Sequence, residues 1–521
     1  MNTRTHRFQW SSLLALAAAA ALLGCGGGGG GYGGGGQMQP PLVSLSSTAL
    51  AFGPEATGTT SASQAVTVDN TGGDTLTVSG VTPSGANLAD FAQTNNCGAV
   101  AAGTSCTVNV TFTPSASGAA SATLNIASNA ASSPDTVGLT GTGTPAAGAN
   151  TVAATVDTGP TGNGLNILYV TVTVCAPGTA TCQTIDHMQL DTGSQGVRIL
   201  SEVLLDPLKS ALTTRTSGAG HALVECAQFG DGYSWGPVKT VDLTMSGRTA
   251  AGLSVHVIGD PAYPPTSVPT PCKNGPGGPN EEDTVAAFGA NGIVGVGYFL
   301  QDCGTGCPAD GTVYSDCIAT TCSNYAATTA EQVANPVGQF ATDNNGVIVQ
   351  LPAVVGAATS LSGSLVFGIG TAANNALPSG AIIYQVSPTS GEFTAQFASM
   401  SLTHSFVDSG SNAYFFPNIG TPMLMPCVSP NASFYCPATD TTVSADIMSF
   451  DGLHSLPVTV PVKNLNELVQ TDAVFPGLAG TITGFPSSFD FGLPFFFGKS
   501  VYVAFEGTTL GTTAAPALSF D

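Results

Sequence analysis

The sequence predicts a mostly β protein, in which a β-sandwich is followed by a larger, two-lobed β domain. Apolar residues make up 43% of the 521 residues and charged residues only 8%, while 66 glycines and 34 prolines supply frequent turns. Short alternating apolar and polar runs are typical of strands, and apart from the N-terminal leader no run has the periodicity of a long helix. A short motif containing an aspartate also occurs twice in the C-terminal part, which indicates two related lobes.

Residues 1–24 have the features of a secretory signal peptide: two arginines, no acidic residue and an apolar core. The segment ends in Leu22-Leu23-Gly24-Cys25, which resembles the lipobox of bacterial lipoproteins. The resemblance implies cleavage before Cys25, a lipid such as palmitate on its sulfur, and attachment to a membrane. Because Gly26 follows Cys25, it also implies the outer membrane of a bacterial cell envelope. The alternative is a plain signal peptide that ends near a cysteine by chance.

Residues 25–41 are rich in glycine and predict a flexible tether. From residue 42 to 143, short strands alternate with turn clusters at regular spacing, which predicts a β-sandwich of about 100 residues. Its distinctive motifs are Asn70-Thr71-Gly72, Asn96-Cys97-Gly98, Gly103-Thr104-Ser105-Cys106, Phe112-Thr113-Pro114 and Leu139-Thr140-Gly141-Thr142-Gly143. With these motifs the stretch resembles the immunoglobulin-like repeats of the abnormal-spindle and choice-of-anchor type. The resemblance implies a spacer or adhesion module without catalysis.

A short linker leads into residues 151–521, whose length suits two lobes, about 151–355 and about 356–521. Each lobe contains one copy of the repeated motif, Leu190-Asp191-Thr192-Gly193-Ser194 in the first and Val407-Asp408-Ser409-Gly410-Ser411 in the second. In each copy an apolar strand ends in an aspartate, and a hydroxyl residue and a glycine then turn the backbone tightly.

If the two turns face each other, the carboxyl groups of Asp191 and Asp408 share one proton, because like charges at contact distance cannot both ionise. One carboxyl then acts as a base towards water, while the other donates a proton to a substrate carbonyl. A third copy, Val156-Asp157-Thr158-Gly159, is followed by Pro160 and polar residues instead of an apolar strand. An ordinary turn explains it better.

Five further segments occur in order along the chain: Phe229-Gly230-Asp231-Gly232-Tyr233, 291–298 and 363–368 lie downstream of Asp191, and 491–496 and 501–505 come after Asp408. Together with the two aspartate turns they resemble the pepsin-like aspartic peptidases, over residues 166 to about 520. Together with the resemblance of residues 42–143, this one implies an immunoglobulin-like β-sandwich followed by a bilobal pepsin-like β domain, with a cleft between the two aspartates that holds a peptide or protein. It also implies hydrolysis of peptide bonds without a cofactor or metal.

The resemblance assigns supporting roles to the residues around the two aspartates. Thr192 and Ser409 brace the two loops against each other through hydroxyl-to-backbone bonds, and Ser194 and Ser411 bond the outer carboxylate oxygens. The glycines of the turns and the residues of a flap hairpin that closes over substrate complete the expected site: Gly193, Gly410, Phe229, Gly230, Gly232 and Tyr233.

Three residues depart from the pepsin-like pattern. Phe229 stands in place of the flap tyrosine and Arg198 in place of its indole partner, so the usual phenol-to-indole hydrogen bond cannot form. Tyr233 or Trp235 from the same hairpin are candidate substitutes, and Arg198 is interpreted as solvent-facing or ion-paired. Asp490 stands where an apolar residue is usual. A catalytically inactive surface lipoprotein that uses the same cleft for binding or adhesion is therefore the alternative function.

The chain also resembles an uncharacterised family of bacterial Cys-rich lipoproteins, through Asp343-Asn344-Asn345-Gly346-Val347 and a Phe-rich segment at 492–498. Thirteen cysteines are present, so removal of Cys25 leaves an even number, which predicts disulfides in an oxidising envelope. Short loops favour the pairs Cys97–Cys106, Cys175–Cys182 and Cys427–Cys436. A zinc site is the less favoured alternative for Cys303, Cys307, Cys317 and Cys322, because no histidine lies near them.

The formal net charge of −22 makes nucleic acid an unfavourable partner, since its phosphates are repelled. No serine, histidine and aspartate are arranged as a nucleophilic triad. His187 and His404 each precede a motif aspartate by four residues, so on a regular strand they point to the same side as that aspartate. They are candidates for bordering the site, although coincidence is the favoured explanation.

Overall fold

The computed structural model describes residues 39–521 apart from residues 57, 116–117, 145–149, 276, 309, 311, 420–422, 470 and 483–484. The described chain forms two compact units, one that ends at Ala146 and one that continues from Ala147 to Asp521. The predicted signal peptide, Cys25 and most of the predicted tether lie outside the described residues. Among the residues that are described, none of the helices has the length and apolar character needed to cross a bilayer.

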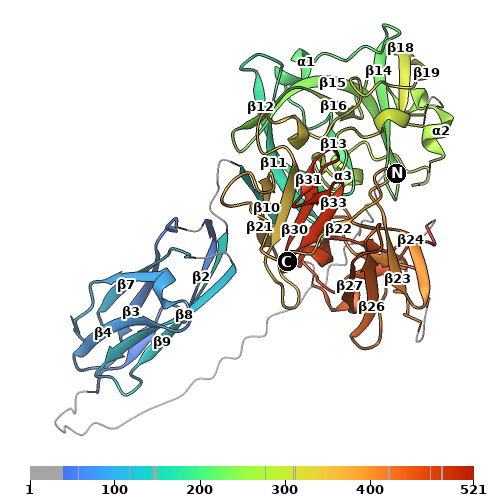
Figure 1. The fold of residues 1–521 in the computed structure, drawn as a ribbon. Helices are drawn as coiled ribbons and strands as arrows, with labels where there is room; N and C mark the ends of the chain where they lie inside the picture. The colour runs from blue at the N-terminus through green and yellow to red at the C-terminus, as the bar shows by residue number, and fades with distance from the viewer. Residues whose placement is uncertain are drawn as a thin grey trace. The chain divides into compact units, whose positions relative to one another are not determined.

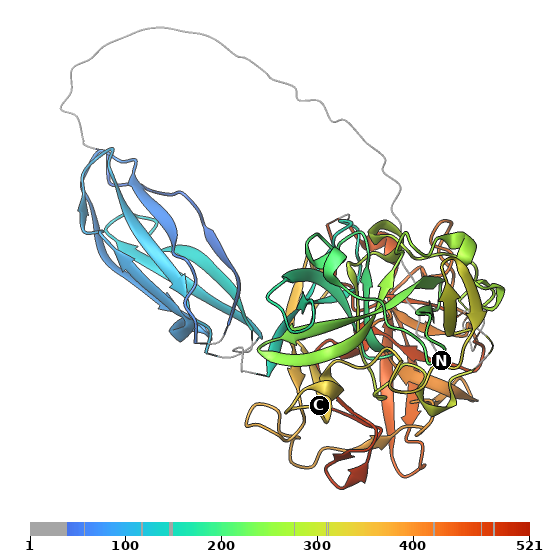
Figure 2. The same ribbon diagram turned by 90° about the horizontal axis from the view of Figure 1, so that it is seen from above.

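The N-terminal unit is a sandwich of two sheets, ordered β1-β3-β7-β5 and β2-β9-β8-β4-β6 (Figures 1 and 2). Alternate residues of these strands are buried, and Phe52, Phe91 and Phe112 pack together in the core. The strands are β1 (Val43–Leu45), β2 (Ala49–Ala56), β3 (Gln64–Asn70), β4 (Leu76–Ser84), β5 (Phe91–Asn95), β6 (Ala99–Val100), β7 (Ser105–Phe112), β8 (Gly118–Ser128) and β9 (Asp135–Thr144).

The first lobe of the C-terminal unit occupies one end of a 15-stranded sheet. Its strands are β10 (Thr151–Val156), β11 (Leu168–Cys175), β12 (Cys182–Asp191), β13 (Gln195–Leu200), β14 (Ala222–Gln228), β15 (Tyr233–Met245), β16 (Arg248–Ile258), β17 (Gly292–Val296), β18 (Tyr314–Ile318) and β19 (Thr321–Asn324). Its short helices are α1 (Leu208–Ala211), α2 (Thr270–Lys273) and α3 (Val285–Phe288).

The same sheet continues through β21, β20, β30, β33 and β22, so the last strands of the chain pair beside strands from the middle of the sequence. In Figure 1 these strands lie between the lobe that carries β14 to β19 and the lobe that carries β23, β24, β26 and β27. Their bounds are β20 (Gly346–Leu351), β21 (Leu361–Phe367), β22 (Tyr384–Gln385), β30 (Lys499–Ala504) and β33 (Ala517–Phe520).

The second lobe contains a seven-stranded sheet ordered β27-β26-β23-β24-β29-β25-β28. Its strands are β23 (Phe393–Phe397), β24 (Met400–Val407), β25 (Tyr414–Phe416), β26 (Thr441–Met448), β27 (Ser455–Val462), β28 (Ala479–Thr481) and β29 (Asp490–Phe491), and a small hairpin joins β31 (Thr509–Leu510) to β32 (Thr513–Ala514). Single 3₁₀ turns occur at Leu88–Asp90, Pro265–Ser267, Gly304–Gly306, Val337–Gln339, Leu465–Glu467 and Leu493–Phe496.

The two lobes share one local arrangement around the aspartate turns. In the first lobe β17 pairs parallel with β12 and antiparallel with β13. In the second lobe β29 pairs in the same way with β24 and β25. The backbone under each turn is so close that only a glycine fits there. A Cβ on Gly295 would lie 2.8 Å from the Ser194 carbonyl carbon, and a Cβ on Gly492 would lie 2.1 Å from the Ala413 oxygen. The predicted β-sandwich followed by a larger, two-lobed and mostly β domain is confirmed.

Six disulfides join all the cysteines that are described, and they include the three predicted pairs. Cys303–Cys307 and Cys317–Cys322 are also disulfides, so the zinc alternative for these four residues is wrong. Cys226–Cys272 spans 46 residues and joins β14 to α2. Its pairing was not predicted, because the two cysteines are not close in the sequence.

Asn166, which precedes β11, ties the start of the first lobe to the second lobe. Its side chain donates to the carbonyl oxygens of Asn412, at 2.9 Å, and Phe475, at 2.8 Å, and accepts from the Phe475 N–H at 2.7 Å. Its backbone has φ of 51°, a conformation that asparagine tolerates better than most residues. Since Asn166 is only 1% exposed, water cannot replace these bonds.

We therefore expect Asn166→Ala to lower the free energy of unfolding by about 3 kcal/mol, because several buried backbone groups lose their partner. The urea midpoint of the C-terminal unit measures the effect. The matched control is Asn274→Ala, which changes an exposed asparagine of the same unit. Equal midpoints for the two variants would contradict the importance of this link.

Candidate active site

The aspartates of the repeated motif lie at equivalent places in the two lobes. Asp191 is the last residue of β12, and Asp408 directly follows β24. The end of each strand that leads to the aspartate is largely buried, at Met188 to Asp191 in β12 and at Ser405 to Val407 in β24, so each carboxyl group is delivered to the interior at the point where the backbone turns. Asp191 is 1% exposed and Asp408 is fully buried.

The two carboxyl groups meet across the lobes. A Cβ atom on Gly410 would lie 2.6 Å from Asp191 Oδ1 and 3.0 Å from Asp408 Oδ1, so both oxygens border the same point. The two groups are hydrogen-bonded. Burial, the charges of Asp191 and Asp490, and the hydrogen bond to Asp191 raise the pKa of Asp408 well above its ordinary value of 3.8. Asp408 therefore keeps its proton where an exposed aspartate has lost it.

The two turns are braced reciprocally by their hydroxyl residues. The Thr192 N–H donates to Ser409 Oγ and the Ser409 N–H donates to Thr192 Oγ1, each at 3.0 Å. Ser409 Oγ also donates to the Leu190 carbonyl oxygen at 2.9 Å. These bonds cross between the lobes and fix the separation of the two carboxyl groups.

Each carboxyl group also accepts hydrogen bonds within its own turn. Asp191 Oδ1 accepts from the N–H groups of Gly193, at 2.7 Å, and Ser194, at 3.2 Å, and Asp191 Oδ2 accepts from Ser194 Oγ at 2.5 Å. Asp408 Oδ1 accepts from the Gly410 N–H at 2.7 Å, and Ser411 Oγ lies 2.9 Å from Asp408 Oδ2. The two glycines and two serines thus hold both carboxyl groups in a fixed orientation.

Asp490, the departure on β29, lies directly behind the second turn. It is fully buried, and its Oδ2 accepts a hydrogen bond from Ser411 Oγ at 2.6 Å. The sequence identified Asp490 as unusual but did not place it beside Asp408, because the two strands are paired in the sheet although they are far apart in the sequence.

Gln189 also belongs to the site, and the sequence analysis missed it. Its Nε2 donates to the Gly410 carbonyl oxygen at 2.8 Å, and it is 1% exposed. Its Oε1 has no hydrogen-bond partner among the described residues. The sequence feature that could have identified Gln189 is its position two residues before Asp191, because alternate residues of a strand share a face.

The predicted flap motif forms the hairpin of β14 and β15, but its tip is packed and not free. Phe229 is 3% exposed and meets Phe288 edge-on at 5.5 Å. A Cβ on Gly232 would lie 2.5 Å from the Asn280 oxygen, so the following chain covers the tip; Gly230 stays half-buried and Tyr233 packs near Trp235. Trp235 was one of two candidates to replace the missing phenol-to-indole pair of the flap. Its indole instead donates to Ser267 Oγ at 3.1 Å, so this candidate is wrong.

Arg198 is buried, so the solvent-facing interpretation is wrong and the ion-paired one is confirmed. Its guanidinium lies 2.6 Å from Glu225 Oε1 and 3.2 Å from Asp302 Oδ2. Although burial opposes the shift, Arg198 and His256 hold the pKa of Glu225 well below its usual range. Burial and the neighbouring Glu225 raise the pKa of Asp302. The cluster lies within the first lobe and fixes Asp302 at the edge of a cavity between the lobes.

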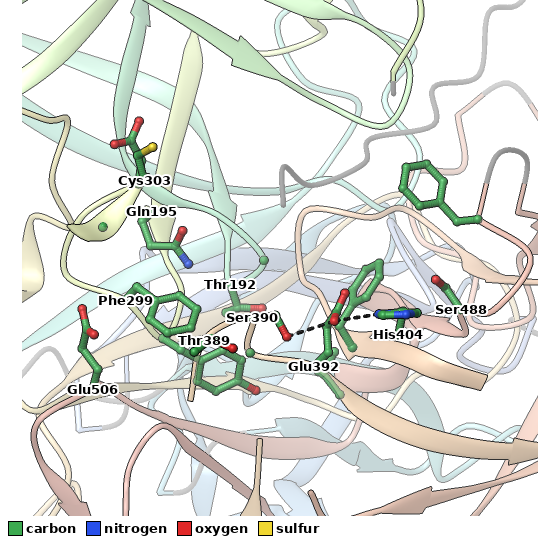
Figure 3. Close-up of a pocket in the computed structure, with 18 of the residues that line it drawn as sticks. Thr192, Gln195, Phe299, Cys303, Thr389, Ser390, Glu392, His404, Ser488 and Glu506 are labelled. Carbon is green, nitrogen blue, oxygen red and sulfur yellow. Dashed lines mark hydrogen bonds and ion pairs between the residues drawn. The ribbon is translucent and has the colours of Figure 1, made fainter. Parts of the chain in front are cut away.

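A cavity of about 390 Å³ lies between the lobes beside the two turns (Figure 3). Its lining includes Thr192 and Gly193, which follow Asp191, and Val407, which precedes Asp408. The cavity therefore reaches both aspartate turns. Neither aspartate side chain belongs to its lining. The lining residues are Thr192, Gly193, Gln195, Tyr298, Phe299, Gln301, Asp302, Cys303, Gly304, Thr389, Ser390, Gly391, Glu392, His404, Phe406, Val407, Phe485, Pro486, Ser487, Ser488 and Glu506.

The two histidines of the sequence analysis have different places. His404 lines the cavity, and its Nδ1 lies 2.9 Å from Glu392 Oε2, which also accepts from Ser390 Oγ at 2.9 Å (Figure 3). His187 does not line it and lies near Asp157 and Asp186. No group of three or more His, Cys, Asp or Glu side chains in the described part of the chain is placed to hold a metal ion.

The fold and this geometry define a class of bilobal β proteins with a carboxyl pair between the lobes. The chain belongs to the family described as "Protein of unknown function (DUF3443)", whose profile matches residues 146–520. Residues 41–136 match the profile described as "Abnormal spindle-like microcephaly-assoc'd, ASPM-SPD-2-Hydin", which confirms the predicted type of immunoglobulin-like module. No curated protein matches this chain.

Among solved structures, an aspartic proteinase from Irpex lacteus is similar over 71% of this chain and 96% of that chain, with 16% identity and a TM-score of 0.41. A protein of unknown function from Porphyromonas gingivalis W83 is similar over 20% of this chain and 48% of its own, with 19% identity and a TM-score of 0.18. The VesB protease of Vibrio cholerae is similar over 19% of this chain and 31% of its own, with 23% identity and a TM-score of 0.17. Likeness at this level carries no activity over to this chain.

The raised pKa of Asp408 makes stability depend on pH. In the unfolded chain Asp408 ionises near 3.8, whereas in the folded protein it keeps its proton to higher pH. Its contribution to stability is therefore complete below the unfolded value and is lost as the pH rises through the folded-state pKa. We expect Asp408→Asn to raise the Tm at pH 7 by about 2 °C or more relative to wild type, and to flatten the rise in Tm on acidification. Thermal unfolding from pH 4 to 7 measures this.

The control is Asp446→Asn, because Asp446 is exposed on β26 of the same lobe. If Asp408→Asn and Asp446→Asn follow the same pH curve, the carboxyl group of Asp408 does not keep its proton in the folded state.

Proposed function

We propose that this protein is an aspartic-type peptidase, which hydrolyses peptide bonds through a water activated by Asp191 and Asp408. The observation that carries the proposal is the hydrogen-bonded contact of two buried carboxyl groups from different lobes, one of which has a raised pKa. Pairs of titratable groups whose environments separate their pKa values are typical of acid and base partners in catalysis. A structural role alone does not require two acids to meet.

In the proposed reaction Asp191 accepts a proton from water, and the water oxygen bonds to the carbonyl carbon of the peptide. Asp408 donates its proton to the carbonyl oxygen, which gives a tetrahedral intermediate. This intermediate collapses when its C–N bond breaks and a C=O bond re-forms: one of its hydroxyl groups returns a proton to Asp408, and the leaving nitrogen takes the proton that Asp191 received. The serine and N–H bonds hold both carboxyl groups in place during these transfers.

The cavity beside the turns supports a peptide or protein as the ligand. Both lobes line it, as expected for a groove that an elongated chain crosses. Phe299, Phe406 and Phe485 provide apolar contacts, and Gln195 and Ser390 provide hydrogen-bonding groups. Ligand contacts are therefore proposed within this cavity, beside the two turns.

A binding or adhesion module without catalysis is the second candidate function. It is favoured by the near-complete burial of both aspartates, by the packed hairpin tip and by the Gln189 amide on the Gly410 carbonyl oxygen. The same cavity then holds a peptide that is not cleaved.

Digestion of a peptide library from pH 3 to 7 by the mature protein tests the two candidates. We expect cleavage by wild type and a loss of about 10³-fold or more in both Asp191→Asn and Asp408→Asn, because either change removes the acid–base pair. Asp446→Asn is the matched control and keeps activity. Cleavage that survives Asp191→Asn excludes the proposed mechanism, and saturable peptide binding without cleavage by wild type identifies the binding module.

We further propose that the protein is anchored in the bacterial cell envelope, in the outer membrane, by a lipid on Cys25. The support is the sequence Leu22-Leu23-Gly24-Cys25 after an apolar segment. A single lipid chain gives only reversible binding, so stable anchoring needs more than one acyl chain at this residue.

We expect wild type expressed with labelled palmitate to carry the label and to sediment with outer membranes. Cys25→Ser is expected to lose the label and to appear in the soluble fraction of the envelope. Label that remains on Cys25→Ser would rule out this attachment site.

A further inference from the structure

The cavity between the lobes carries several acidic groups and little positive charge. Three carboxyl groups line it, those of Asp302, Glu392 and Glu506. The described lining contains one imidazole, of His404, and no lysine or arginine. Two of the ten lysines and arginines of the chain lie in the leader, and each of the others bonds to a carboxylate or a backbone carbonyl oxygen. These others are Arg198, Lys209, Arg215, Lys239, Arg248, Lys273, Lys463 and Lys499.

Two of the three carboxyl groups have a neighbour that can balance their charge. Asp302 Oδ2 lies 3.2 Å from the Arg198 guanidinium, and Asp302 Oδ1 accepts from the Tyr314 hydroxyl at 2.8 Å. Glu392 Oε2 lies 2.9 Å from His404 Nδ1, and this imidazole is a cation when it is protonated. A ligand would have to compete with these partners for either group.

Glu506 is held in place without a cation. Its Oε1 accepts from the Leu300 N–H at 2.8 Å, and its own N–H donates to the Tyr298 carbonyl oxygen at 2.8 Å. These bonds fix the residue, but an amide N–H carries no net charge. No lysine, arginine or histidine in the described part of the chain forms an ion pair with Glu506. Its negative charge is therefore available to a cationic ligand, which the acidity of the whole chain also attracts.

An aromatic side chain adjoins this carboxylate. Phe299 lies between the two residues whose backbone groups bond to Glu506, and the side chains of Phe299 and Glu506 both belong to the cavity (Figure 3). Lysine and arginine side chains combine an apolar stem, which packs on apolar surface, with a charged head that needs a polar partner. Their heads are also attracted to the face of an aromatic ring. A phenyl ring and an unbalanced carboxylate in one cavity match both parts of such a side chain.

We propose that the cavity binds a lysine or arginine side chain of the peptide, beside the bond that is held at the dyad, and that Glu506 selects it. The same cavity reaches the two aspartate turns through Thr192, Gly193 and Val407, so one peptide can contact both Glu506 and the turns. The inference names the substrate class of the proposed peptidase and rests on that function for cleavage. Binding of a basic peptide does not depend on it.

The test uses a peptide library with one position varied among lysine, arginine, norleucine and glutamate, at pH 6, where an ordinary glutamate is ionised. Norleucine keeps the apolar stem of lysine without its charge. We expect wild type to cleave the lysine peptide with a kcat/KM about tenfold higher than the norleucine peptide, because only lysine pairs with the Glu506 carboxylate. In Glu506→Gln, which keeps an acceptor for the Leu300 N–H, the two values are expected to be similar.

Two further variants sharpen the comparison. Glu506→Lys reverses the charge and is expected to favour the glutamate peptide over the lysine peptide. Glu467→Gln is the matched control, because Glu467 is exposed and does not line the cavity, and it is expected to keep the wild-type ratio of lysine to norleucine. Circular dichroism checks that each variant is folded, and either Glu506 variant suffices if the other is not.

A second measurement does not depend on activity. The library is passed over immobilised Asp191→Asn protein, in which the proposed mechanism does not operate. Lysine and arginine peptides are expected to be retained about tenfold more than the norleucine peptide. This difference is expected to shrink with added salt, which screens charges, and to disappear when Glu506→Gln is added.

The outcomes separate the two proposals. If wild type cleaves peptides and Asp191→Asn does not, but no basic preference is found or the preference survives in the Glu506 variants, the role of Glu506 is overturned and the peptidase proposal stands. If wild type shows no cleavage but retention of basic peptides depends on Glu506, the peptidase proposal fails and the selection of basic side chains stands. The absence of both cleavage and this retention overturns both.

Discussion

Two carboxyl groups that meet inside a protein repel each other when both are ionised, and the C-terminal unit is built around this constraint. The repulsion is avoided because both turns supply hydrogen-bond donors to the carboxyl groups and because Asp408 keeps its proton. The reciprocal bonds of Thr192 and Ser409 then hold the lobes at the one distance at which the acids share that proton. Because these bonds cross between lobes, the geometry of the site and the packing of the lobes cannot change independently.

Two features of the rest of the unit support this contact. The strands around each aspartate are arranged in the same way in both lobes, and both lobes contribute to one sheet. Each turn packs on a glycine, Gly295 in β17 and Gly492 directly after β29, since any side chain there would collide with backbone atoms. The two sets of strands have the same pairing directions around each aspartate. The strands β20, β21, β30 and β33 join residues from both halves of the sequence in one sheet, so neither lobe is complete without the other half of the chain.

What was predictable from the sequence was local. The aspartate turns, the strand alternation and the disulfides across short loops depend on neighbouring residues, and these predictions agree with the structure. The partners of Arg198, the position of Asp490 behind Ser411, the Cys226–Cys272 disulfide and the packing of the hairpin tip all depend on contacts between distant segments. Gln189 is intermediate, because strand periodicity placed it on the side of Asp191 but could not show that its amide bonds to Gly410 in the other lobe.

The disulfide between β14 and α2 fixes the strand that carries Glu225, the ion-pair partner of Arg198. Through Arg198 the same strand holds Asp302, which lines the cavity. A support that is covalently tied is already ordered before a ligand arrives, so binding loses less conformational entropy than it would if the support had to order first. In a reducing medium this support loses its covalent tie, so the redox chemistry of the surrounding compartment becomes part of what keeps Asp302 in place.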